Sequence, residues 1–207
     1  MNGIKFKYDD KQSMYVLSDG LPIKQVYTCY DLEMYWVNNK QRLLIGQNDA
    51  GEIFFKLESM LSLALQQQLK LDPSIQKSLG YYWNEIFADR GALVDLVYEY
   101  DPVCKYESWI GTKYYMICTV YPHNPTITTW IYNNEYGDII LEVTPMFVWA
   151  GDEVTTQEEL NRYFAFLKDY KPILQQIIPQ AIAQEWLEQA QKWYKVFYDN
   201  EQKDCGR

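Results

Sequence analysis

The chain has 207 residues, of which 48% are hydrophobic and 16% aromatic, and it carries a formal net charge of −9 at pH 7. This length and composition predict one folded domain with a substantial core and exclude a disordered chain. An acidic surface repels phosphate backbones, so nucleic-acid binding is disfavoured, although the same charge also serves solubility. No apolar run approaches the roughly 18 residues of a membrane-spanning helix.

Cysteine usage and the first residues favour a cytoplasmic protein with reduced thiols. The four cysteines are far apart and form no C-x-x-C pair, and the start M-N-G-I-K-F-K-Y-D-D contains no apolar segment of a signal peptide. His123 is the only histidine. A single histidine and scattered cysteines do not make a four-ligand metal set, so we expect no structural metal and no cofactor.

Residues 1–50 read as short strands and turns. Five runs suit strands and are separated by turn formers about every ten residues: 4–8, 14–17, 25–30, 33–37 and 42–45. The stretch G-Q-N-D-A-G at 46–51 lacks the spacing of a dinucleotide-binding loop and reads as a turn.

Residues 53–90 read as helical. Leu57, Leu61 and Ala64 recur at helical spacing within 53–71. A second helix is predicted after Asp72, a good N-cap residue that is followed by Pro73 at the first helical position.

Residues 92–149 predict an antiparallel β-meander, centred on about 114–144. Its strands are expected at 114–121, 127–132 and 138–144, and turn formers separate the last two strands. Pro145 lacks a backbone N–H, so regular pairing should end there or continue only at an edge of the sheet. The stretch 92–100 fits a strand or a helix, with its tyrosine and valine content narrowly favouring a strand.

Residues 155–200 read as helical. Thr155 and Thr156 can each form a capping box with a glutamate three residues later. Pro179 opens a last helix, and Trp186 and Trp193 lie on its one continuous apolar face. The complete pattern predicts a single α+β domain over 1–207, an antiparallel sheet with helices packed on one face and a C-terminal helical segment.

The sequence offers no established catalytic motif: it has no G-x-S-x-G, no G-x-G-x-x-G and no phosphate-binding P-loop. Asp95 and Glu99 would share one face of either a helix or a strand, and such a pair can do acid–base or glycosidic chemistry. Acidic pairs of this kind more often lie on a solvated face. A second group consists of Glu107, Ser108 and Trp109, with Tyr114, Trp130 and Tyr132 on neighbouring predicted strands. It could bind a sugar or a basic peptide, or could simply pack.

Three functions remain open. The first is a non-enzymatic binding protein, of the kind that bacteria use as cytoplasmic immunity proteins against toxins, with a basic partner. Residues 91–149 favour it because they hold two basic and seven acidic residues, a net charge of −5. The expected partner-binding residues are Asp95, Glu99, Glu107, Trp109, Trp130 and Tyr132. The alternatives are a carboxylate-dependent hydrolase or sugar-binding protein, and an assembly protein that uses its C-terminal helices.

Overall fold

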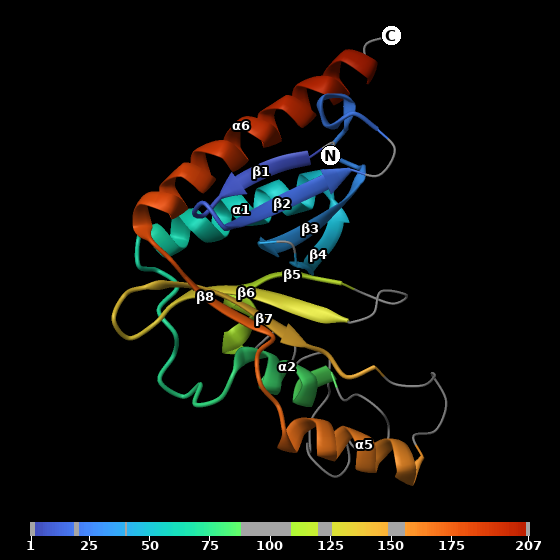
Figure 1. Cartoon of the computed structure of the whole chain (residues 1–207), viewed down its shortest axis with the longest axis vertical. Coiled ribbons are helices and arrows are strands. Elements are labelled where there is room, and N and C mark those ends of the chain that lie inside the picture. Colours follow the sequence, from blue (N-terminus) through green and yellow to red (C-terminus); the bar gives the residue numbers. More distant parts are fainter. Residues whose placement is uncertain are drawn as a thin grey trace.

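A computed structural model describes residues 3–18, 21–39, 41–87, 109–119, 126–148 and 156–205. These residues form two antiparallel sheets of four strands each and four α-helices, which confirms the α+β class. Figure 1 shows α6, α1 and the first sheet at one end, the second sheet below them, and α2 and α5 at the other end. Where one sheet with helices on one face was expected, two sheets each carry their own helices.

The first sheet contains strands β1 (Gly3–Lys7), β2 (Gln12–Ser18), β3 (Asp31–Asn38) and β4 (Gln41–Asp49), in that order. Four of the five strands predicted in this region are confirmed. The exception is 25–30, which follows a short 3-10 helix, η1 (Ile23–Gln25). Its backbone has other partners, because Asn200 donates hydrogen bonds from its side-chain amide to the carbonyls of Lys24 and Val26.

Helices α1 (Ala50–Leu65) and α6 (Gln180–Cys205) cover one face of the first sheet. The predicted turn at 46–51 is in fact the passage from β4 into α1, where the Asp49 carboxylate accepts a hydrogen bond from the backbone N–H of Glu52 and caps the helix. On the sheet, Phe6 stacks on Phe54 of α1 and meets Trp186 of α6 edge-on.

The second sheet contains strands β5 (Tyr115–Cys118), β6 (Ile127–Asn133), β7 (Ile139–Pro145) and β8 (Leu174–Ile178), in that order. The first three strands confirm the predicted meander. Strand β8 corrects the prediction that 155–200 is all helical, because it pairs antiparallel with β7 between α5 (Gln157–Lys168) and α6. Helix α2 (Leu79–Phe87) begins later than predicted and packs against β7 on the face opposite α1.

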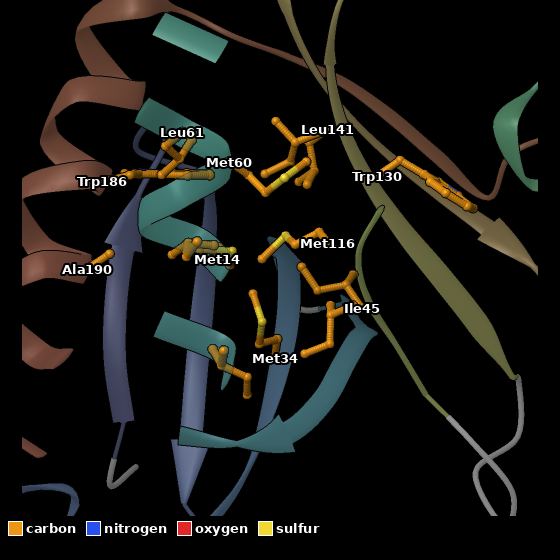
Figure 2. Close-up of a cluster of buried hydrophobic side chains, with 14 of the residues drawn as sticks. Met14, Met34, Ile45, Met60, Leu61, Met116, Trp130, Leu141, Trp186 and Ala190 are labelled. Carbon is orange, nitrogen blue, oxygen red and sulfur yellow. The ribbon is translucent and has the colours of Figure 1, made fainter. Parts of the chain in front are cut away.

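The main core lies between α1 and the two sheets. Met14, Met34, Met60 and Met116 meet there, together with Ile45 and Leu141 (Figure 2). Methionine is unbranched and adaptable, so it fills the irregular space between surfaces that do not run parallel. A Cβ atom at Gly46 would lie 2.4 Å from the side chain of Ile117, so glycine there permits the close approach of β4 and β5.

The central strands of the second sheet are buried on both faces, since β6 is buried along its whole length. Figure 2 shows Trp130 pointing away from the methionine cluster, toward the far side of the sheet. There its ring meets the rings of Trp83, at 5.2 Å between centroids, and Trp109, at 6.2 Å. Among the described helices, none combines the length and the hydropathy that a membrane crossing requires.

Candidate functional site

The six predicted partner-binding residues fall into two groups. Asp95, Glu99 and Glu107 lie outside the described residues. Trp109 is half-buried, Tyr132 is 5% exposed and Trp130 is fully buried. The Trp130 indole N–H also donates to the Thr144 hydroxyl at 2.8 Å. Their partner-binding role stays a prediction, and the burial of Trp130 and Tyr132 argues for packing, since buried rings offer a partner no surface.

Tyr132 belongs to a buried polar network around Glu142, a residue that the sequence did not single out. Glu142 is 2% exposed, and its carboxylate accepts hydrogen bonds from the Ser78 hydroxyl at 2.8 Å and the Tyr132 hydroxyl at 2.9 Å. The Gln175 amide donates to it at 3.1 Å, and the backbone N–H of Leu79 donates as well. A carboxylate from β7 therefore caps the first turn of α2.

Burial raises the pKa of Glu142, and the four donors oppose this increase because they stabilise the charged form. Burial also raises the pKa of Tyr132, and the neighbouring Glu142 charge adds to the effect. All four described hydrogen-bond partners of the carboxylate are donors, so the arrangement suits a fixed structural acceptor. One signal in the sequence pointed to Glu142. On the predicted strand it shares a face with Ile140 and Thr144, which are both uncharged.

Helix α2 lies very close to β7 because residue 80 is glycine. A Cβ atom there would lie 2.2 Å from the Thr144 hydroxyl oxygen and 2.2 Å from the Tyr170 hydroxyl oxygen. Alanine in a helix is ordinarily favoured over glycine by about 1 kcal/mol. We expect Gly80→Ala instead to lower the free energy of unfolding by about 1–3 kcal/mol, because the added methyl group overpacks this contact.

Urea denaturation of the purified chain measures this effect. Gly51→Ala, in the first turn of α1, is the matched control, since its Cβ atom would meet no neighbour closer than 3.1 Å. A Gly80→Ala variant as stable as the parent would contradict the close approach of α2 and β7.

An accessible candidate surface lies at the other end of the molecule, where α1 packs beside α6 (Figure 1). Phe55 on α1 is 51% exposed and Tyr198 on α6 is 49% exposed. Tyr194, one turn before Tyr198, lines a shallow groove of about 330 Å³ together with Phe55 and the exposed Cys29. Exposed aromatic rings from two helices therefore share one surface.

Carboxylates surround these rings. Asp49 and Glu52 line the same groove, Glu58 accepts a hydrogen bond from Gln191 at 3.2 Å, and Glu201 accepts one from the groove residue Thr28. Nearby cations include Lys56, which is 3.9 Å from Glu52, Lys195, which follows Tyr194 in α6, and Lys192, which follows Gln191. We call this surface the α1–α6 seam and define it as Asp49, Glu52, Phe55, Glu58, Tyr194, Tyr198 and Glu201.

In comparisons with known proteins, no protein-family model, curated protein or solved structure matches the chain. Among the described residues, no three His, Cys, Asp or Glu side chains group closely enough to hold a metal ion. His123 lies outside these residues, and the expectation of no structural metal stays a prediction.

Proposed function

We propose that this chain is an acidic protein-binding module that meets a basic partner through the α1–α6 seam. The observation that carries the proposal is the presence of exposed aromatic rings, Phe55 and Tyr198, among carboxylates on one surface of a chain with a net charge of −9. Within this class we favour an immunity-type inhibitor of a basic protein, because size and charge suit that role.

The two kinds of side chain have separate tasks in such an interface. Aromatic residues near the centre of an interface supply most of the lasting affinity, because they bury a large area with few rotatable bonds. Carboxylates around them attract a basic partner and accelerate the encounter. Of the four carboxylates of the seam, only Glu52 forms an ion pair with a described residue, which is Lys56.

The test begins with the complete chain as bait in an extract of its native host, followed by binding kinetics with the purified partner at two salt concentrations. We expect Phe55→Ser with Tyr198→Ser to raise the dissociation rate by about tenfold or more. We expect Glu52→Gln with Glu58→Gln to slow association several-fold and to flatten its salt dependence, with little change in dissociation.

Tyr136→Ser is the matched control, since this tyrosine is 82% exposed but belongs to the turn between β6 and β7. A variant with Asp95, Glu99 and Glu107 all changed to amides tests the acidic residues that the sequence analysis singled out. The proposal fails if the partner is acidic, or if the Phe55/Tyr198 variant binds as the parent does. If only the triple amide variant slows association, the acidic part of the site belongs to residues 95–107.

A further inference from the structure

We infer that the cleft between α2 and α5 is a binding site for an anionic sugar, a polyhydroxylated molecule with one phosphate or carboxylate group. The cleft has a volume of about 630 Å³, which is within the range of small-molecule sites. It lies at the opposite end of the molecule from the α1–α6 seam, so the inference is independent of the proposed function (Figure 1).

The charge of the cleft is opposite to that of the chain. Among the described residues that line it are Lys77, Lys168 and Lys171, and Glu85 is the one carboxylate of that set. This gives a local charge of +2 in a protein whose net charge is −9. Three lysines come together there from two separated segments of the chain, and they raise the local concentration of anions.

Two of these lysines are available for an anion. Within the described residues, neither Lys168 nor Lys171 forms an ion pair. Lys77 is held instead over the ring of Tyr81, with its ammonium nitrogen 3.6 Å from the ring centroid. A lysine ammonium acts as a point charge with three donors, which suits phosphate and carboxylate oxygens alike.

Hydroxyl-binding groups lie beside the lysines. The Ser78 hydroxyl donates its hydrogen to Glu142, so its oxygen lone pairs remain to accept from a ligand hydroxyl. Glu85 is a second acceptor in the same cleft, and it is held near Tyr81 by a hydrogen bond. Inorganic phosphate carries only one or two hydroxyl donors near pH 7, whereas a sugar carries several, spread around its ring, and can reach both acceptors while its anionic group meets the lysines.

Aromatic surface completes the site. Tyr81 and Tyr170 meet edge-on with 5.8 Å between ring centroids, and Phe164, which is 50% exposed, forms part of the wall. Aromatic faces cover the apolar C–H face of a sugar ring, while hydroxyl groups at its rim reach polar neighbours. Together the lysines, the acceptors and the rings fit an anionic sugar better than a neutral sugar or a bare anion.

The experiment is isothermal titration calorimetry of the full chain with four probes: glucose 6-phosphate, gluconate, glucose and inorganic phosphate. We expect at least one of the two anionic sugars to bind with a Kd of about 1 mM or below, and to bind about tenfold more tightly than glucose and inorganic phosphate. The comparison of glucose 6-phosphate with gluconate decides between phosphate and carboxylate as the preferred anionic group.

The variant Lys168→Gln with Lys171→Gln should weaken that binding by about tenfold or more. The control, Lys5→Gln with Lys11→Gln, changes the net charge equally on exposed lysines of β1 and of the turn between β1 and β2, and should leave Kd within about twofold. Absence of binding by both anionic sugars at about 20 mM overturns the inference. Equal binding of glucose, equal binding of inorganic phosphate, or equal weakening in the control also overturns it.

Discussion

Replacing Trp186 by alanine is expected to lower the free energy of unfolding by about 3–5 kcal/mol. The side chain is 2% exposed and joins α6 to the first sheet. Its ring lies 6.1 Å from the ring of Phe6 and 6.3 Å from the ring of Trp36, and its indole N–H donates to the carbonyl of Lys7 at 2.8 Å. Truncation therefore removes a large buried area and leaves a cavity between three elements.

Urea denaturation followed by far-UV circular dichroism measures this loss. Trp186→Phe retains an aromatic ring in the same space, so we expect it to recover more than half of the stability that alanine loses. Tyr198→Ala, on the same helix but 49% exposed in the parent, is the matched surface control and should cost less than about 1 kcal/mol. An alanine variant at 186 with near-parental stability would contradict the docking of α6 through this residue.

The elements that the sequence predicted are those whose pattern depends on near neighbours. In β1 buried and exposed residues alternate, as for Ile4 and Phe6 beside exposed Lys5 and Lys7, and the two-residue period reveals the strand. In α6 apolar residues recur at helical spacing, and this pattern correctly predicted that Trp186 lies on the buried face. The cluster of turn formers Asn133, Asn134 and Gly137 likewise predicted the hairpin of β6 and β7, because a turn depends on consecutive residues.

The elements that the sequence missed depend on distant partners. Strand β8 is short, and its pairing with β7 joins Val143 to Leu174, about thirty residues apart. Its alternation of half-buried and exposed residues is too weak to be recognised without that partner. The division into two sheets is likewise invisible locally, because it depends on how β4 packs on β5.

The candidate site shows the same limit. Strand β6 is buried on both faces, so a two-residue period cannot tell whether Trp130 and Tyr132 point toward solvent or into a core. The exposed rings of the α1–α6 seam come from helices that are more than a hundred residues apart in sequence. Acidic composition predicted a basic partner, whereas the surface that we propose for it depends on the packing of α1 against α6.

Glu142 provides the second large expected effect. We expect Glu142→Leu to lower the free energy of unfolding by about 2–5 kcal/mol, because it removes the common acceptor of the Ser78 and Tyr132 hydroxyls and the Leu79 N–H. Glu142→Gln retains one acceptor oxygen and should cost less than leucine does. A leucine variant as stable as the parent would show that these donors find other acceptors or water.

The pH dependence of the free energy of unfolding distinguishes the Glu142 carboxylate from the uncharged glutamine side chain, which has nearly the same shape. Burial raises the pKa of Glu142 above its ordinary value of 4.5, so the native state holds this proton more tightly than the unfolded state does. The resulting stabilisation is present below pH 4.5 and is lost as the pH rises through the raised pKa of the native state. The glutamine variant has no proton to lose there.

The stability advantage of the parent over Glu142→Gln should therefore decrease as the pH rises from 4 toward 7, as measured by urea denaturation at matched ionic strength. Other titrating groups are common to both proteins and cancel in this difference. An advantage that increases with pH would mean that the four donors outweigh burial and lower the pKa of Glu142. In that case the carboxylate caps α2 in its charged form throughout this range.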